Sequence, residues 1–488
     1  MDVYKFAISG RSNDRLSLTA QLRLCCWLES EMSFVGQERK VMGETKETPR
    51  EATSGIKATD TAKAVSAMRR AYYDRVHHAR ERGQFVAWAM WGVSEEVLYA
   101  MDVLPVLAEN YGPVCAAKQI GPFFCEIAES DGFSMDICSY LRTGLGLAKK
   151  THELGGQAPP EAPYGGMGKP DMLIGNAQFC DGRFKWLQQL GRYLDVPYFG
   201  YDIQEWPLGK DINDPVLLKH YVDHYHEQLK RLVAFLEKVT GRKMDKYRLS
   251  EALRNWMKVQ KLFYAAGQFR KHSPNPLPAQ DSATIAFPNL HMKCWPETVD
   301  FYQRLHDELK YRVEHNMSSL PEEKYRLLWH LIMPWYYLGI YNWLEQEFGA
   351  TTMNPTYEGG EVPDESIIDY DFPLESIARK MYNKIWGVNA LGGRRMGDVS
   401  RQLDFIEEYD IDGVLGMFVA SCRATTNLYD VWQRFNDGLK KRGLRVPTLG
   451  IEADMVDTRT YSDALVKQRI RAFMETVAEA KRERQKAK

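Results

Sequence analysis

The chain has 488 residues, a formal net charge of −1 and 44% hydrophobic residues, which suits a protein of two or three globular domains. Acidic and basic residues nearly balance, so neither nucleic acid nor an anionic membrane surface is an expected partner. The eight cysteines lack the spacing of a disulfide framework and form no CxxC pair, which favours a reducing, cytoplasmic location.

The first 59 residues predict little regular structure. Residues 1–23 are mixed in character, and the apolar stretch 22–28 is too short for a signal peptide and lacks a cleavage site. Met32 and Met42 are alternative start positions, which would make the preceding residues an upstream extension. We therefore expect residues 1–59 to form a disordered arm or an extension.

Residues 60–206 predict a first α/β domain. A helix over 60–82 ends at Gly83, and Ser94 is a plausible N-cap for a helix that starts with two acids, Glu95 and Glu96. Strands are expected at residues 85–91, 104–108, 170–176 and 196–202, and a Gly/Pro-rich loop at 161–169.

Residues 207–380 predict a largely helical insertion that covers a site or forms a partner surface. Helices are expected at residues 216–239, 246–270, 296–316 and 321–348. The stretch 272–296 holds five prolines and is not expected to be regular. The apolar segment 327–344 contains His330 and Pro334, which favours a buried, kinked helix over a membrane span.

Residues 381–488 predict a second α/β domain with a C-terminal helix. A strand is expected at 384–388, followed by the glycine-rich loop 389–397. Such a loop can hold phosphate on free backbone N–H groups, and Arg394 and Arg395 would assist, although a simple turn is the commoner explanation of the glycines.

One pattern occurs twice. Residues 170–183 and residues 411–423 each contain an aspartate, an apolar strand and a cysteine followed by a helical segment, and each leads to a VPxxG strand, at residues 196–202 and 446–452. The repeat predicts two similar Rossmann- or flavodoxin-like α/β domains, although short apolar strands also resemble one another by chance. Ligands of open α/β sheets lie beyond the carboxyl ends of the strands, which is where Cys180 is expected.

The chain lacks a P-loop and the HExxH, GxSxG and GxGxxG motifs in their proper contexts, so ATP hydrolysis by this chain is not expected. Cysteine is the remaining reactive residue type. Cys138, Cys180 and Cys422 each fall in a loop beside a helix start or a strand end. Three thiolates from separate loops can hold an iron–sulfur cluster, but buried packing cysteines are the commoner explanation of such spacing.

Three short motifs and a C-terminal pattern change that balance. The motifs are Cys138-Ser139-Tyr140, Cys180-Asp181-Gly182 and Ser421-Cys422-Arg423, and the pattern covers residues 451–459 and 468–475. From about residue 85 to residue 477 the chain resembles the 2-hydroxyacyl-CoA dehydratase / benzoyl-CoA reductase family. The resemblance implies that Cys138, Cys180 and Cys422 ligate a [4Fe-4S] cluster, and it leaves Cys115, Cys125 and Cys294 as structural residues.

The family has two activities. Dehydratases remove water from a 2-hydroxyacyl-CoA by radical chemistry, and benzoyl-CoA reductases add electrons to an aromatic ring. Both use two related cluster-bearing subunits, which receive electrons from a separate ATP-hydrolysing iron–sulfur activator with ferredoxin upstream. Dehydratases tend to carry a small or hydroxylic residue shortly before a Glu-Glu pair, where this chain has Trp91 before Glu95 and Glu96.

The resemblance therefore implies the larger catalytic subunit, of the B/O type, of an ATP-dependent benzoyl-CoA reductase. Such an enzyme is an oxidoreductase acting on CH–CH bonds, and it converts benzoyl-CoA into a cyclic dienoyl-CoA in anaerobic aromatic degradation. Two alternatives stay open: a 2-hydroxyacyl-CoA dehydratase subunit, and a non-catalytic subunit that relays electrons. Glu95, His291, His330 and Tyr140 are candidate proton donors, with helix capping as the alternative role of Glu95.

Overall fold

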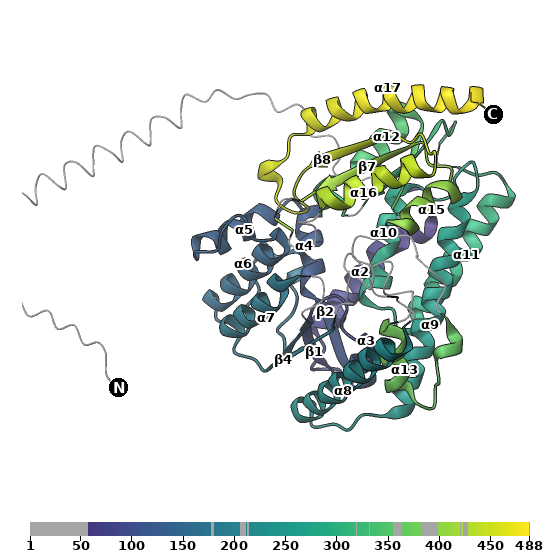
Figure 1. Ribbon diagram of the computed structural model, residues 1–488. Coiled ribbons are helices and arrows are strands. Elements are labelled where there is room, and N and C mark those ends of the chain that lie inside the picture. The colour runs from purple at the N-terminus through teal and green to yellow at the C-terminus, as the bar shows by residue number, and fades with distance from the viewer. Residues whose placement is uncertain are drawn as a thin grey trace, which may run out of the picture. The chain divides into compact units, whose positions relative to one another are not determined.

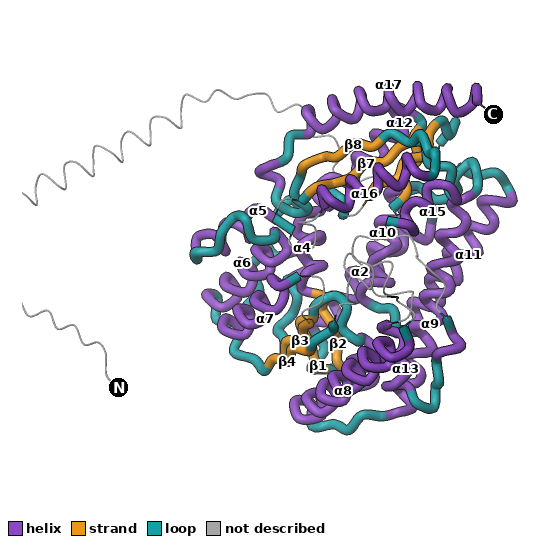
Figure 2. The backbone as a smooth tube through the Cα atoms, in the orientation of Figure 1, coloured by secondary structure: helices purple, strands orange, loops and turns teal. Residues whose placement is uncertain are grey.

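The computed structural model describes residues 57–176, 180–204, 211, 214–318, 320–330, 332–354, 364–382, 399–419, 421–422 and 428–487. Within these residues the strands form two parallel sheets of four, seen as two orange groups in Figure 2. The fold is α/β, as predicted. No helix in the described ranges is both long and apolar enough to cross a membrane.

Sheet A comes from the first part of the chain. Its strands, in spatial order, are β2 (Val103–Leu107), β1 (Phe85–Ala89), β3 (Met172–Asn176) and β4 (Tyr198–Tyr201). Helices α2 (Asp60–His77), α3 (Glu95–Ala100), α4 (Ala108–Ala117), α5 (Gly121–Ser130), α6 (Ser139–Glu153) and α7 (Asp181–Leu194) precede or connect these strands. Strands β1, β2 and β3 are largely buried, and alternate residues of β3 belong to different apolar clusters, so β3 is covered on both faces.

Sheet B repeats this topology. Its spatial order is β6 (Ala350–Met353), β5 (Tyr325–His330), β7 (Gly413–Phe418) and β8 (Thr448–Glu452), again all parallel. Helices α12 (Gly339–Phe348), α15 (Ser400–Glu408), α16 (Leu428–Lys441) and α17 (Asp463–Ala487) accompany it. The last helix, yellow in Figure 1, runs beside β8 and packs its apolar side on the same core.

An aspartate fixes the register of the third strand in each sheet. Asp171 precedes β3 and accepts the backbone N–H of Val86 at 2.8 Å, and Asp412 precedes β7 and accepts that of Arg326 at 3.0 Å. In return, each aspartate's own N–H donates to the carbonyl of the same partner at 2.7 Å. The shared topology and this shared contact confirm the predicted pair of similar α/β units.

The VPxxG motif also has a common physical basis. A Cβ atom on Gly200 would lie 2.6 Å from the ring of Phe184, and one on Gly450 would lie 2.0 Å from the ring of Phe418. Neither distance is compatible with a side chain. The repeated glycine therefore allows an aromatic ring to pack against the edge strand in both sheets.

Between β4 and β5 the described chain is mainly helical, with α8 (Pro215–Thr240), α9 (Lys246–Gln268), α10 (Ala279–His291) and α11 (Pro296–Glu314), and a further helix, α13 (Pro373–Tyr382), lies between β6 and β7. The start of α8 is well determined, because the Asp214 side chain accepts the N–H groups of residues 216 and 217 and Pro215 occupies the first turn. Its end is equally clear, since Gly241 adopts a left-handed conformation.

The predicted helix over residues 321–348 is wrong in its first half. Residues 325–330 form β5 at the centre of sheet B, and β6 follows at 350–353, so a central strand lies in the range expected to be helical and a second strand directly follows it. A short apolar run buried on both faces has no helical or strand period, which is why the pattern misled. Only α12 remains of that helix.

The stretch 272–296 was also predicted wrongly. Residues 279–291 form α10, which includes Pro288. The helix begins directly after Pro278, and most of its residues are buried. Tertiary packing thus outweighs the proline signal. The predicted strand at 384–388 and the loop 389–397 lie outside the described residues.

Candidate functional site

Sheet A places one predicted cysteine at its carboxyl edge. Cys180 occupies the N-cap position of α7, shortly after β3, with an extended backbone (φ −156°, ψ 151°). Cys138 likewise occupies the N-cap position of α6. Both thiols thus lie at helix starts, where backbone N–H groups favour a thiolate.

Cys422 comes from sheet B. It follows β7, is 7% exposed and donates its backbone N–H to the carbonyl of Val419 at 3.1 Å. Its side chain packs in the core of sheet B, and Cys138 contacts that core as well as the core of sheet A. Cys138 therefore bridges the cores of the two sheets.

The three thiols lie within electrostatic reach of one another. Burial is the main cause that raises the pKa of Cys138, and the charges of Cys422 and Cys180 raise it further. Burial also raises the pKa of Cys180 to about 11, with added contributions from Glu109 and Cys422 against the opposing effect of Arg183. The fold thus brings together three cysteines that are far apart in the sequence.

This donor set suits an iron–sulfur cluster. The described residues contain no group of three or more His, Cys, Asp or Glu side chains close enough to hold a single metal ion. Cysteines that hold a [4Fe-4S] cluster bind separate irons and therefore do not converge on one point. The thiols, of which Cys422 is buried and the other two are partly exposed, are soft donors that would lose their protons when iron binds.

The remaining described cysteines lie in packed surroundings. Cys115, Cys125 and Cys294 are each at most 2% exposed, and burial raises the pKa of each thiol. The Cys125 thiol lies 3.6 Å from the hydroxyl of Thr143, inside the core of sheet A's helices. These contacts agree with the structural role expected for the three residues.

An acid–base pair that no sequence pattern indicated lies next to Cys180. Glu109 Oε2 accepts from Arg183 at 2.5 Å and from the backbone N–H of Trp91 at 2.9 Å. Arg183 is 2% exposed and also donates to Asn176 Oδ1 at 3.1 Å. Trp91, Glu109 and Asn176 each lie at or just beyond the end of a neighbouring parallel strand, a relation visible only once the strand order is known.

Tyr140, a candidate proton donor, lies two residues after Cys138. Its hydroxyl accepts from Trp335 Nε1 at 2.6 Å. That bond joins α6, one of the helices of sheet A, to the segment that follows β5 of sheet B. Tyr140 therefore belongs to the surroundings of the cysteines.

Glu95 and His291 belong to a different, buried environment. Glu95 is 3% exposed and pairs with Lys293 at 3.0 Å; burial raises the pKa of Glu95 to about 7, against the opposing effect of Lys293. His291 stacks on Phe287, and burial lowers its pKa to about 3, so it is neutral. Ser94 occupies the predicted N-cap position, but its hydroxyl bonds Tyr225 instead of capping the helix.

His330, another candidate, ends β5 at the carboxyl edge of sheet B. Burial lowers its pKa to about 4, and its ring stacks near Phe435 and Trp432. Arg394 and Arg395, the predicted CoA-phosphate contacts, lie outside the described residues.

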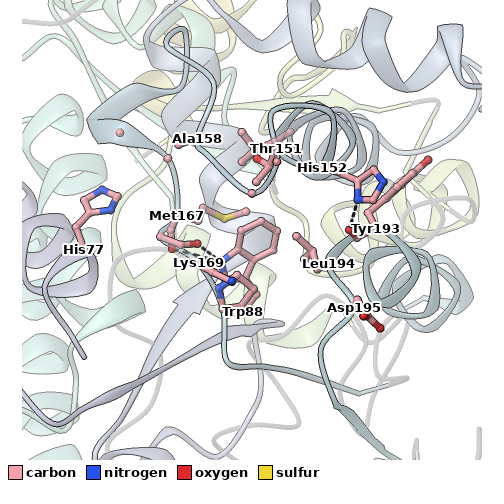
Figure 3. Close-up of a pocket in the computed structure, with 17 residues that line it drawn as sticks. His77, Trp88, Thr151, His152, Ala158, Met167, Lys169, Tyr193, Leu194 and Asp195 are labelled. Carbon is pink, nitrogen blue, oxygen red and sulfur yellow. Dashed lines mark hydrogen bonds between the residues drawn. The ribbon is translucent and has the colours of Figure 1, made fainter. Parts of the chain in front are cut away.

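A separate pocket of about 380 Å³ lies at the other end of sheet A (Figure 3). Lys169 and Pro170, just before β3, contribute to its lining, as do His152 near the end of α6 and Tyr193 near the end of α7. None of the predicted site residues lines it. The pocket is therefore distinct from the edge that carries the cysteines.

Comparison with known proteins gives a consistent result. The family model described as 2-hydroxyglutaryl-CoA dehydratase, D-component, matches residues 90–477. The (R)-2-hydroxyisocaproyl-CoA dehydratase alpha subunit of Clostridioides difficile is 26% identical over 84% of this chain and 94% of its own length. The (R)-phenyllactyl-CoA dehydratase alpha subunit of Clostridium sporogenes is 25% identical over 83% of this chain and 92% of its own length.

Another relative carries the name of the other activity. A benzoyl-CoA reductase subunit of Thauera aromatica is 25% identical to this chain over 83% of its residues and 91% of the reductase subunit's length. The reductase subunit is thus about as similar to this chain as the dehydratase alpha subunits are. Overall identity does not separate the two reactions.

Proposed function

We propose that this chain is an iron–sulfur subunit of an ATP-dependent benzoyl-CoA reductase. The chain belongs to the 2-hydroxyglutaryl-CoA dehydratase D-component family. Family members act on acyl-CoA thioesters. In the proposed reaction the aromatic ring of benzoyl-CoA gains two electrons and two protons and becomes a cyclic dienoyl-CoA. Proposed partners are a related cluster-bearing subunit and an ATP-hydrolysing iron–sulfur activator supplied by ferredoxin.

The observation that carries this proposal is the position of Trp91, just after the end of β1. Trp91 is half-buried, and its backbone is held from both sides: its N–H by Glu109, and its carbonyl by Arg183 and Asn176. The same Glu109 and Arg183 act electrostatically on Cys180. A bulky aromatic side chain at this edge supplies no hydroxyl for a 2-hydroxyacyl substrate and offers an apolar face for a benzoyl ring.

Cys138, Cys180 and Cys422 would hold the cluster, which supplies low-potential electrons when bound. The chain's own contribution is a dry environment and fixed charges. The Glu109–Arg183 pair keeps the strand edge beside Cys180 in one conformation, since both groups are mostly buried and paired. The candidate proton donors are Tyr140, Glu95, His291 and His330, of which Tyr140 lies two residues after Cys138 and bonds to Trp335.

A dehydratase remains the second candidate, because four similar proteins are 2-hydroxyacyl-CoA dehydratase alpha subunits. The deciding experiment is an anaerobic assay of the complete complex with its activator, ATP and reductant. Benzoyl-CoA and an (R)-2-hydroxyacyl-CoA are offered in parallel. The proposal expects a dienoyl-CoA product from benzoyl-CoA; dehydration of the hydroxyacyl-CoA with benzoyl-CoA untouched would replace it with the second candidate.

A further experiment addresses an electron-relay role. EPR spectra of the reduced subunit are recorded with and without benzoyl-CoA, while the partner subunit's cluster is kept oxidised. A catalytic subunit is expected to change its own cluster signal when the acyl-CoA binds. An unchanged signal at saturating acyl-CoA would favour the relay.

Replacing Trp91 tests its proposed contact with the ring directly. Trp91→Ser is expected to lower kcat/KM for benzoyl-CoA by roughly tenfold with iron content unchanged, since one aromatic pair contributes about 0.5–1.5 kcal/mol beyond its buried area. Trp91→Phe keeps an aromatic face and serves as the matched control, with less than about half of that free-energy loss. Equal kinetics in wild type and Trp91→Ser would show that the ring does not rest on Trp91.

A further inference from the structure

The turn after β8 connects both halves of the cysteine site. Asp454 is 8% exposed and lies where β8 ends, at the carboxyl edge of sheet B. Its Oδ1 accepts the backbone N–H groups of Val456 at 2.8 Å and Asp457 at 2.9 Å. Its Oδ2 accepts the hydroxyl of Ser421 at 2.9 Å. The carboxylate is thus fixed in its own turn and bonded to the residue directly before Cys422.

The same turn reaches the other half of the molecule. Asp457 accepts from Arg142 at 2.9 Å, and Arg142 Nε donates to the carbonyl of Ile137 at 2.8 Å. Ile137 directly precedes Cys138. Residues 454–457 are therefore bonded to the neighbours of two of the three cysteines, one in each α/β unit.

The two aspartates of this turn differ in charge balance. Asp457 pairs with Arg142 and Arg459. Within the described part of the chain, no lysine or arginine forms an ion pair with Asp454. Its bonds are to backbone N–H groups and a hydroxyl, which are dipoles and leave its net charge in place. That charge lies one hydrogen bond from Ser421, the residue directly before Cys422.

We propose that Asp454 is a positioning residue whose uncompensated charge lowers the reduction potential of the group held by Cys138, Cys180 and Cys422. This inference rests on the proposed function. Reduction adds a negative charge, and a fixed carboxylate in a nearly dry site disfavours that charge far more than one in water does. By contrast, the Glu109 carboxylate beside Cys180 is balanced by Arg183.

The test replaces the charge and keeps the shape. Asp454→Asn can still accept the two N–H groups and donate to the Ser421 hydroxyl. In an anaerobic redox titration followed by EPR, the midpoint potential is expected to move to a less negative value, with iron and acid-labile sulfide unchanged. Glu452→Gln removes the same charge two residues away from an exposed side chain, and it is expected to leave the potential at the wild-type value.

Ser421→Ala separates position from charge. It removes the bond to Asp454 Oδ2 and keeps the carboxylate, so we expect faster iron loss to a chelator with a potential that stays near the wild-type value. A fully loaded Asp454→Asn protein with an unchanged potential would overturn the inference. An equal shift in Glu452→Gln would do the same, because the effect would then be one of net charge alone.

A folding or loading defect does not block the test. If Asp454→Asn holds less than half of the wild-type iron, Asp454→Glu and Asp454→Gln are compared instead. Their side chains have the same length, and only that of Asp454→Glu carries a charge. The charged member is expected to have the more negative potential, and equal potentials would refute the idea. Absence of iron from wild type contradicts the proposed function itself, whereas normal iron with an unshifted potential contradicts only the role of Asp454.

Discussion

Lys380→Met is expected to lower the free energy of unfolding by roughly 3–5 kcal/mol, because it leaves a buried carboxylate without its counter-ion. Lys380 is 6% exposed, pairs with Glu96, and lies 3.5 Å from the centre of the Trp256 ring. Methionine keeps the length and the contact with the ring. Denaturant unfolding of the intact chain measures the difference.

The neighbouring residue supplies the control. Arg379 pairs with Glu375 on the same helix, α13, but both side chains are well exposed, so Arg379→Met is expected to cost about 0–1 kcal/mol. Adding Glu96→Gln to Lys380→Met removes the unpaired charge and is expected to recover much of the loss. Equal losses of unfolding free energy in Lys380→Met and Arg379→Met would mean that the buried Lys380–Glu96 pair does not stabilise the packing of α13 on α3.

Arg142→Met has the second large expected effect, and it reaches the cysteine site. Arg142 is 2% exposed and pairs with Glu129 and Asp457 in addition to its bond to Ile137. We expect a loss of about 3 kcal/mol, at the low end for a broken buried pair, because Arg459 still neutralises both carboxylates. We also expect faster loss of iron to a chelator, since the turn before Cys138 is released.

Arg459→Met is the matched control, because Arg459 shares both carboxylates but makes no described bond to the turn before Cys138. It is expected to lower stability without changing the rate of iron loss. Identical iron-loss rates in Arg142→Met and wild type would show that the Arg142 ion-pair network does not stabilise the cysteine site.

The network also predicts the acid response. Burial alone would raise the pKa of Asp457, but hydrogen bonds from Arg459 and Arg142 lower this pKa to about 2. A carboxyl with a depressed pKa stabilises the fold above its unfolded pKa of about 3.9, and this contribution disappears as the pH falls through the folded value. In acid unfolding curves, stability is expected to drop between about pH 4 and pH 2, and less steeply in Arg142→Met.

The duplicated design was predictable because each copy has a physical signature. An aspartate before a buried strand, a cysteine after it and a glycine on the next strand are all readable from the sequence. Asp171 and Asp412 indeed hold equivalent backbone groups, and Gly200 and Gly450 both admit an aromatic ring. Such local constraints recur wherever the local structure recurs.

Strand β5 was not predictable by the same means. Leu327, Leu328 and Trp329 are buried on both sheet faces, so the run shows neither period that distinguishes a strand from a helix. The Glu109–Arg183 pair was missed for a different reason. Its members follow separate strands, and only the spatial strand order makes them neighbours. The three cysteines were predicted as a site through family resemblance, since spacing alone favoured packing residues.

The central claim is that Cys138, Cys180 and Cys422 hold a [4Fe-4S] cluster, and the most direct test is the iron and acid-labile sulfide content per chain after strictly anaerobic purification. Wild type and Cys180→Ser are compared as folded protein together with the partner subunit. The account predicts about four of each per chain in wild type and a clear loss in Cys180→Ser. Iron-free wild-type protein would show that these cysteines are packing residues and would contradict the proposed function.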